Sequence, residues 1–342
     1  MVILGIETSC DETAASVVRD GKEILSNAIA SSVEMHAKTG GIIPEQAARE
    51  QVRSIIPVIS EATVNSKYEI KNIDAIAVTC GPGLIGSLLV GVETARTLAW
   101  VWNKPIVPVN HLLGHIYANW LQTPPILPAI ALVVSGGHTD IVLLKDRKEI
   151  EWIGGTRDDA AGETFDKAAR LLELGYPGGP AISAAAEKFQ TTNPKTQIKL
   201  PRPLLYDKTF DFSFSGLKTA VLREVNHLKE INQFNSETTN QVAHEVQEAI
   251  TDVLVIKTLK AVREYCVNTV LVSGGVAANS RLREKFALEI ENWKLEIDLR
   301  VPPPHLCTDN ADMVAAAAEF NYHPIPWQEV TTNPGLQIAE AV

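Results

Sequence analysis

The sequence has few cysteines and no long apolar run, and each absence excludes a class of protein. Its 342 residues include four cysteines, none of them in a C-x-x-C pair. This pattern excludes both a disulfide framework and a cysteine zinc site. The longest apolar runs, such as residues 126–134, contain proline and are too short to span a bilayer.

The beginning of the chain also lacks the features of a secretory signal. Its apolar residues 1–6 meet a carboxylate, Glu7, too early for a signal peptide. We therefore expect a cytoplasmic protein with no membrane partner. Apolar residues make up 45% of the chain, which is enough for a full core. The length suits two domains of ordinary size or one large duplicated fold.

Positive charge is scarce overall but concentrated in one stretch. The net charge is −10, which by itself argues against a nucleic-acid binder. Between residues 188 and 223, however, only Asp207 and Asp211 oppose seven basic residues. These are Lys188, Lys195, Lys199, Arg202, Lys208, Lys218 and Arg223. A solvated loop and a phosphate-contacting surface are equally good explanations of this stretch.

The order of predicted elements indicates a duplicated α/β fold. Strands are expected at residues 2–7, 14–18 and 23–30, with a hairpin at Asp20-Gly21. A helix at 44–63, which Pro57 should kink or divide, is followed by strand 73–79, helix 84–101, strand 105–109 and helix 111–121. About 130 residues later a similar series begins, with strands at 129–135, 140–145 and 148–153. Helices 163–174, 215–228 and 237–265, strand 269–273, helix 278–290, strand 296–301 and helix 310–319 complete it. Alternating elements in two halves predict an α/β fold with a cleft between the halves.

Glycine-rich turns follow several of the predicted strands. They lie at residues 5–13, 134–139 and 273–279. Glycine allows backbone N–H groups to approach a phosphate closely, and a helix N-terminus favours its charge. None of the turns matches a Walker loop or the dinucleotide fingerprint. Together they favour a nucleotide site, in which Asp166 could accept hydrogen bonds from a ribose and segment 176–180 supplies another sharp bend.

Two histidines form the most informative local pattern. If a helix begins after Asn110, a good N-cap residue, His111 and His115 lie one turn apart on the same face. Their nitrogens could bind one metal ion, and Asp309, near the N-terminus of the last helix, is the best candidate for a third ligand. Two histidines and one carboxylate leave coordination positions open, a pattern that suits Fe(II) or catalytic Zn(II).

The same pair could belong to a zinc peptidase, but the spacing argues against one. A helical zincin carries H-E-x-x-H, in which the glutamate activates the metal-bound water. Here Leu112, Leu113 and Gly114 separate the histidines, so the motif has no general base. A transferase is favoured over a metallopeptidase. A small-molecule kinase remains an alternative, whereas a non-catalytic protein is less favoured because it would typically lack the two histidines and the aspartate.

Taken together, the motifs resemble the TsaD family (older name Gcp), the bacterial-type tRNA N6-adenosine threonylcarbamoyltransferases. The resemblance covers nearly the whole chain and depends on motifs that occur in the family's order. They are residues 5–13, His36 with 40–45, 81–84, His111 with His115, 135–139, 165–167, 273–279 and 307–310.

The resemblance implies the actin/sugar-kinase/heat-shock ATPase superfold, with two ribonuclease H-like halves around a nucleotide cleft. The expected halves are 1–125 and 126–342, the second with a basic helical and loop excursion around 176–230. It also implies transfer of threonylcarbamoyl from threonylcarbamoyl-AMP to N6 of adenosine 37 in tRNAs reading codons that begin with A. Expected partners are the tRNA anticodon loop and TsaB-like and TsaE-like proteins, with a TsaC-type synthase supplying the intermediate.

The resemblance further implies roles for individual residues. His111, His115 and Asp309 would hold one divalent metal ion, Fe(II) first and Zn(II) or Mg(II) as alternatives. The adenylate would contact Val134, Ser135, Gly136, Gly137, His138, Asp166, Gly179, Ser183 and Asn279. Asp11 and Glu12 are candidates for the group that takes the N6 proton. Two positions depart from the family: Ser183 replaces an aspartate of some members, and Gln51 stands where histidine is frequent.

Overall fold

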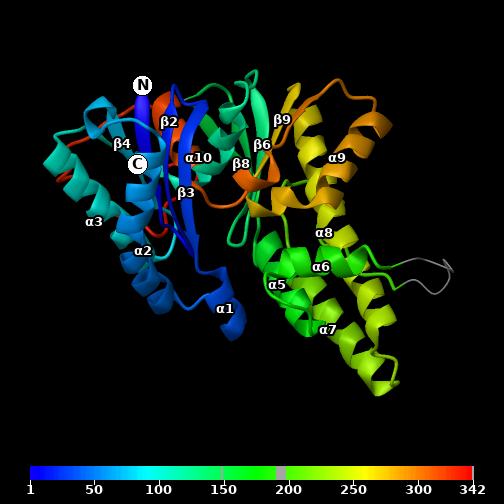
Figure 1. The fold of residues 1–342 in the computed structure, drawn as a ribbon. Coiled ribbons are helices and arrows are strands. Elements are labelled where there is room, and N and C mark those ends of the chain that lie inside the picture. The colour runs from blue at the N-terminus through cyan, green and yellow to red at the C-terminus, as the bar shows by residue number, and fades with distance from the viewer. Residues whose placement is uncertain (148, 190–197, 341–342) are drawn as a thin grey trace. The chain divides into compact units, whose positions relative to one another are not determined.

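The computed structural model describes residues 1–147, 149–189 and 198–340 (Figure 1). The chain divides into two compact units. Unit 1 comprises Met1–Leu127, Lys145–Ile150 and Pro302–Val342, and unit 2 comprises Pro128–Leu144 and Glu151–Val301. The expected domains 1–125 and 126–342 stay a prediction, but the C-terminal segment groups with unit 1 because its helix packs on the first sheet.

Unit 1 contains a five-stranded mixed sheet in the order β3-β2-β1-β4-β5. Its strands are β1 (Val2–Glu7), β2 (Glu12–Arg19), β3 (Glu23–Ser31), β4 (Ala75–Gly81) and β5 (Ile106–Asn110). The first three strands pair antiparallel through two hairpins, whereas β4 and β5 are added parallel to β1. The carboxyl ends of β1, β4 and β5 therefore meet at one edge of the sheet.

Helices cover both faces of this sheet. They are α1 (Val33–Thr39), α2 (Pro44–Asn65), α3 (Ile85–Trp102), α4 (His111–Tyr117) and α10 (Ala311–Phe320), with short 3-10 turns at Ile70–Asn72, Ala118–Leu121 and Pro304–Leu306. Helices α2 and α3 pack on one face, and α10 packs against β1 and β2 on the other (Figure 1).

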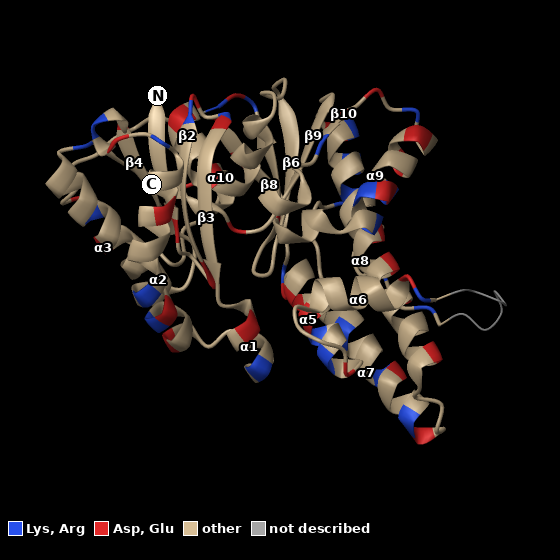
Figure 2. Ribbon diagram, viewed as in Figure 1, with Lys and Arg blue, Asp and Glu red and all other residues tan. Residues whose placement is uncertain are grey.

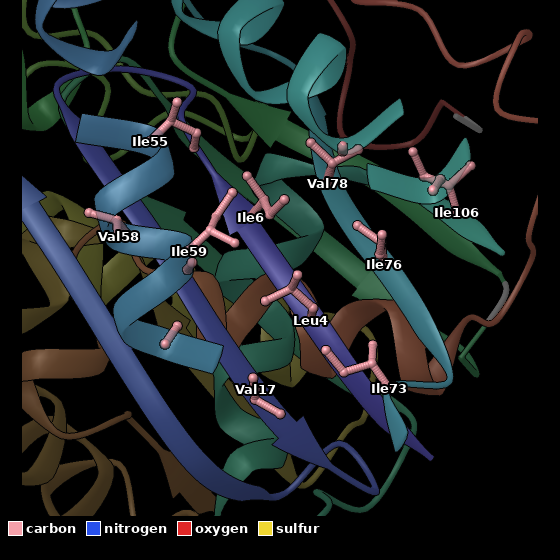
Figure 3. Close-up of a cluster of buried hydrophobic side chains, with 14 of the residues drawn as sticks. Leu4, Ile6, Val17, Ile55, Val58, Ile59, Ile73, Ile76, Val78 and Ile106 are labelled. Atoms are coloured by element: carbon pink, nitrogen blue, oxygen red, sulfur yellow. The ribbon is translucent and has the colours of Figure 1, made fainter. Parts of the chain in front are cut away.

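The alternation of side chains along β1 sorts its residues between these two faces. Val2, Leu4 and Ile6 are buried in the cluster that α2 and α3 complete, where Leu4 and Ile6 lie near Ile55 and Ile59 (Figure 3). Burying an aliphatic side chain of this size contributes about 1.5–3 kcal/mol. Residues of the opposite parity face α10, because successive side chains in a strand point to opposite sides.

Unit 2 repeats the architecture of unit 1. Its sheet order is β10-β9-β6-β7-β8, built from β6 (Ala129–Val134), β7 (Thr139–Leu144), β8 (Ile150–Gly155), β9 (Thr269–Ser273) and β10 (Asp298–Arg300). Again the first two strands form an antiparallel hairpin and the last two are added in parallel. The helices are α5 (Ala161–Leu171), α6 (Gly178–Ala186), α7 (Ser215–Glu230), α8 (Ser236–Glu264) and α9 (Ser280–Asn292). The expected duplication of an α/β half is confirmed.

Three local expectations need correction. Pro57 does not divide its helix, since α2 runs without a break from Pro44 to Asn65; the apolar face of α2 is buried on the sheet and offsets the missing hydrogen bond. Helices α1 and α6 were not expected at all. The helix expected at 111–121 is α-helical only to Tyr117 and continues as a 3-10 turn.

A helix can span a membrane only if it is both long enough and apolar enough. Within residues 1–147, 149–189 and 198–340, none of the helices combines the length and the apolar character that crossing a bilayer requires.

Candidate functional site

The histidine pair lies where β5 ends and α4 begins, in unit 1. Asn110 is the N-cap of α4, and its side-chain oxygen accepts hydrogen bonds from the backbone N–H of Leu112 at 2.9 Å and Leu113 at 3.5 Å. The cap fixes the first turn of the helix, so His111 and His115 point to the same side. Both are buried, and their ring centroids lie 4.6 Å apart.

Asp309 reaches this pair because α10 packs closely on α4 and β1. Asn310 caps α10 by accepting a hydrogen bond from Met313 N–H at 2.9 Å, which places Asp309 just before the helix, as expected. A Cβ on Gly114 would lie 3.4 Å from Met313 Cγ, so the small residue between the histidines permits this approach. Gly114 therefore lies in a helix-packing contact between α4 and α10.

The three side chains converge within coordination range of one another. Asp309 Oδ1 lies 3.2 Å from His115 Nε2 and 3.6 Å from His111 Nε2. One ligand atom from each residue lies within 4.8 Å of the other two. The donor set of two imidazoles and a carboxylate could therefore hold one divalent ion.

The charges around these residues also fit a cation. Burial lowers the pKa of His111, but the carboxylates of Glu7 and Asp309 outweigh burial and raise it to about 9. Burial, together with the negative charge of Asp309, raises the pKa of Asp11. Burial and the neighbouring His111 lower the pKa of His115, whose ring nitrogens make no hydrogen bond of good geometry to the described residues. A bound divalent ion would balance the excess of carboxylates and give His115 a partner.

Sequence reasoning missed Glu7, the last residue of β1. Its side chain is fully buried, and Oε2 lies 3.2 Å from His111 Nδ1. Ser9 Oγ lies 3.2 Å from the same nitrogen. A carboxylate that ends an otherwise apolar buried strand was a visible signal, since charged residues are rarely buried without a specific partner.

Asp11 lies on the turn between β1 and β2, and Glu12 is the first residue of β2, in the same unit. Burial raises the pKa of Glu12 to about 7, with smaller contributions from the charges of Asp11 and Asp309. Gln51 of α2 holds this turn, because its Nε2 lies 3.2, 3.0 and 3.1 Å from the carbonyl oxygens of Thr8, Cys10 and Glu12. The departure at position 51 thus supplies an amide that supports the backbone carrying both carboxylates.

The expected adenylate residues lie in unit 2. Val134 ends β6, and the glycine turn 135–138 joins it to β7. The turn is closed by Ser135 N–H donating to His138 O at 2.9 Å and His138 N–H donating to Ser135 Oγ at 3.2 Å. Within the described residues, the exposed N–H groups of Gly136 and Gly137 donate to no protein acceptor, and a Cβ on either would meet nothing within 4 Å.

The start of α5 lies beside this turn. The N–H groups of Gly162 and Glu163 donate to the carbonyls of Ser135 and Gly136, both at 3.1 Å. The helix N-terminus thus adds positive potential where two backbone N–H groups are available. This arrangement is chemically suited to a phosphate.

The remaining adenylate candidates form two groups in unit 2. Asp166 on α5 accepts a hydrogen bond from Gly178 N–H at 2.7 Å, next to Gly179 in the first turn of α6. Ser183 of α6 donates to Gln247 Oε1 at 2.9 Å, and Asn279 Nδ2 donates to both Ser183 Oγ and Gln247 Oε1, at 2.9 and 3.0 Å. Asn279 also caps α9 through Leu282 N–H.

Gln247 was missed as well. It is buried in the middle of α8, among apolar neighbours, and links Ser183 to Asn279. A polar side chain at an apolar helical position was the available signal, although its partners could not be inferred from spacing.

The basic stretch separates into paired and exposed residues. Arg202 forms ion pairs with Glu245 and Asp252, and Lys218 lies 2.8 Å from Asp159. Lys188, Lys199, Lys208 and Arg223 are exposed, whereas Lys195 lies outside the described residues. Helix α7 carries acidic as well as basic residues (Figure 2).

Comparison with known proteins gives a consistent result. The family described as TsaD, tRNA N6-adenosine threonylcarbamoyltransferase, matches residues 23–316. A tRNA N6-adenosine threonylcarbamoyltransferase from Thermomicrobium roseum is 49% identical, over 94% of this chain and 92% of that protein. One from Listeria welshimeri is 45% identical, over 99% of this chain and 97% of that protein.

Solved structures show the same fold at much lower identity. HypF from T. kodakarensis matches with a TM-score of 0.63 at 13% identity, over 94% of this chain and 47% of that one. Component A of (R)-2-hydroxyglutaryl-CoA dehydratase from Acidaminococcus fermentans matches with a TM-score of 0.53 at 14% identity. The match covers 94% of this chain and 98% of that one. These likenesses concern the fold alone and agree with the expected fold of two α/β halves. The family match and the relatives at 45–49% identity show that the chain belongs to the TsaD family, the tRNA N6-adenosine threonylcarbamoyltransferases.

Proposed function

We propose that this enzyme takes the threonylcarbamoyl group from threonylcarbamoyl-AMP and transfers it to N6 of adenosine 37 in tRNAs that read codons beginning with A. The glycine turn 135–138 carries the adenylate part of the proposal, because beside the start of α5 it offers two exposed N–H groups with no acceptor among the described residues. These groups suit the phosphate of AMP, both in the substrate and as it leaves. Ser183 and Asn279, joined through Gln247, are the proposed contacts of the nucleoside.

We propose that unit 1 supplies the groups that act on the acyl carbon. His111, His115 and Asp309 would hold the metal, Fe(II) in preference to Zn(II), and Mg(II) is the weakest alternative because it prefers oxygen ligands. A divalent ion bound there supplies positive charge to the oxygens of the acyl phosphate. N6 of adenine is a poor nucleophile because its lone pair is delocalised, so positioning of the two reactants is also required and can contribute roughly 7 kcal/mol or more.

Glu12 is the proposed acceptor of the N6 proton. Its pKa of about 7 suits a general base at neutral pH better than an ordinary carboxyl does. Because only the ionised form can accept a proton, the transfer rate is expected to rise with pH through about 7. A Glu12→Gln variant should lose this inflection and most of the activity, as measured by single-turnover rates from pH 5.5 to 8.5. An unchanged pH profile in the variant would exclude Glu12 as the base.

The tRNA is expected to contact the exposed basic residues of unit 2. Charge reversal at Lys199, Lys208 and Arg223 together should weaken tRNA binding and reduce its dependence on salt, by about one unit of log–log slope for each phosphate that is no longer neutralised. Binding would be measured by titration at several salt concentrations. Arg202 is left unchanged because its ion pairs hold unit 2 together.

The matched control reverses three exposed lysines of unit 1, Lys22, Lys38 and Lys71, and changes the net charge equally. If both triple variants lose affinity to the same extent, the effect is one of total charge and the proposed contact is wrong. The target base must also leave its stack to react, so variants are best compared on an intact anticodon stem-loop.

Protein partners of the TsaB and TsaE type, and a TsaC-type synthase that supplies the intermediate, are part of the proposal. Two features support a requirement for partners. The net charge of −10 is unfavourable for binding RNA alone. Helix α2 also exposes an apolar stripe of Val52, Ile56 and Val64, which are 63, 60 and 71% exposed.

The decisive experiment is mass spectrometry of tRNA nucleosides. Unmodified tRNA is incubated with threonine, bicarbonate, ATP and the partner proteins, with this chain present or omitted. Threonylcarbamoyl-adenosine should form only when the chain is present. Phosphorylation of a small acceptor without tRNA modification would favour the kinase alternative, and cleavage of a protein substrate without tRNA or nucleotide would favour the peptidase.

A further inference from the structure

Glu7 is a fully buried carboxylate that the proposed chemistry does not yet use. It ends β1 on the parity that faces α10, and its exposure is 0%. An ionised side chain in such a place is very costly unless hydrogen bonds and opposite charge compensate. Its surroundings therefore indicate what it does.

Each oxygen of Glu7 has defined neighbours from separate segments. Oε1 accepts a hydrogen bond from Ser9 N–H at 2.6 Å, and Oε2 accepts one from Thr79 Oγ1 of β4 at 2.5 Å. Oε2 also lies 3.2 Å from His111 Nδ1 at the start of α4. The parallel pairing of β1, β4 and β5 brings these groups to one edge of the sheet.

We propose that Glu7 is a positioning residue, which holds His111 with Nδ1–H toward the carboxylate and Nε2 free to coordinate the divalent ion. The inference rests on the proposed metal site. A ligating imidazole commonly donates its second N–H to a carboxylate, which fixes the tautomer and the ring orientation. His115 has no such partner for Nδ1 among the described residues. Of the two histidines, only His111 is therefore oriented by a carboxylate.

The isosteric variant Glu7→Gln tests this arrangement, because it replaces one carboxylate oxygen by an NH₂ group that can only donate hydrogen bonds. The backbone N–H of Ser9 is always a donor, so the amide oxygen must turn toward it. The amide NH₂ then faces His111 Nδ1, which must become an acceptor. The ring proton would move to Nε2, the nitrogen that should bind the metal.

The experiment measures Zn(II) binding to the whole chain by competition with a chelator of known affinity. Glu7→Gln is expected to weaken Zn(II) binding about 10- to 100-fold. In Zn(II)-saturated wild-type protein, ¹⁵N spectra of the imidazoles should show the proton of His111 on Nδ1. In the variant the proton should lie on Nε2, so that His111 no longer coordinates the metal. Neither readout depends on transferase activity.

The matched control is Asp312→Asn, which alters another buried carboxylate of unit 1. Asp312 accepts hydrogen bonds from Ser16 and Asn27, and the histidine whose charge acts on it is His305, which is not a proposed metal ligand. Zn(II) affinity should therefore stay within twofold of the wild type. If Glu7→Gln does not fold, Thr79→Val keeps Glu7 but removes a group that orients it, and a several-fold loss of affinity is expected.

Three outcomes separate the possibilities. If His115→Ala binds Zn(II) as tightly as the wild type, the proposed metal site itself fails. If His115→Ala weakens binding but Glu7→Gln and Thr79→Val do not, only the role of Glu7 is overturned. If Ser9→Ala weakens binding and Glu7→Gln does not, the second neighbour of His111 Nδ1 holds the ring, which also overturns the proposal.

Discussion

Replacing His115 with alanine is expected to abolish tRNA threonylcarbamoylation while leaving the protein folded. The site would lose one of its two imidazole ligands, and with it the bound metal ion. A Lewis acid stabilises a transition state by several kcal/mol, so its loss should lower the rate by at least about 1,000-fold. The protein should stay folded and lose only the stability that a buried cavity costs, since His115 gives up no well-formed hydrogen bond to the described residues. The measurements are single-turnover rates, with nucleosides quantified by mass spectrometry, and the thermal unfolding midpoint.

The companion variant His111→Ala should be equally inactive but less stable, because it leaves the buried carboxylate of Glu7 without its imidazole partner. His323→Ala, at an exposed histidine of the same unit, is the control and should retain full activity. Full modification by the His111→Ala/His115→Ala double variant would remove the metal from the mechanism.

A large effect on stability is expected from a single methyl group at Gly5. A Cβ there would lie 2.4 Å from Ala311 O and 3.1 Å from Ala315 N, both backbone atoms of α10. Neither atom can rotate away, so β1 and α10 must separate, and Gly5→Ala is expected to lower the free energy of unfolding by about 2–4 kcal/mol. Chemical denaturation followed by circular dichroism measures this value.

The same substitution should weaken the metal site, because Asp309 precedes α10 and moves with it. Gly175→Ala is the matched control, since a Cβ there would meet nothing within 4 Å and stability should change by no more than about 0.5 kcal/mol. If Gly5→Ala were as stable as Gly175→Ala, the close packing of α10 on β1 would not be what positions Asp309.

Local patterns predicted much of the fold. The hairpin at Asp20-Gly21, the cap at Asn110 and the apolar strands depend on residues close together in sequence. Helix α6 was missed because Gly178, Gly179 and Pro180 are usually read as a turn; its start is held instead by the hydrogen bond from Gly178 to Asp166. Pro57 does not divide α2, because burial of this helix on the sheet outweighs local propensity.

The candidate site also combines features that local sequence predicts with features that depend on tertiary contacts. Spacing alone indicated that His111 and His115 share a helix face, and chemistry suggested Asp309 as their partner. The roles of Glu7, Gln51 and Gln247 depend on contacts between distant segments, as in the amide of Gln51 that holds the turn before Glu12. No periodicity encodes such contacts.

The sequence by itself determined the duplicated α/β class, the histidine pair, the glycine turns and the family resemblance, because each depends on short-range spacing or on motif order. Only the tertiary structure decided that Asp309 lies against the histidine pair, that Glu7 lies next to Nδ1 of His111, and that Gly136 and Gly137 are exposed beside α5. The physical reason is that strand order and helix packing bring distant residues together, and these depend on the burial of whole faces rather than on any local signal.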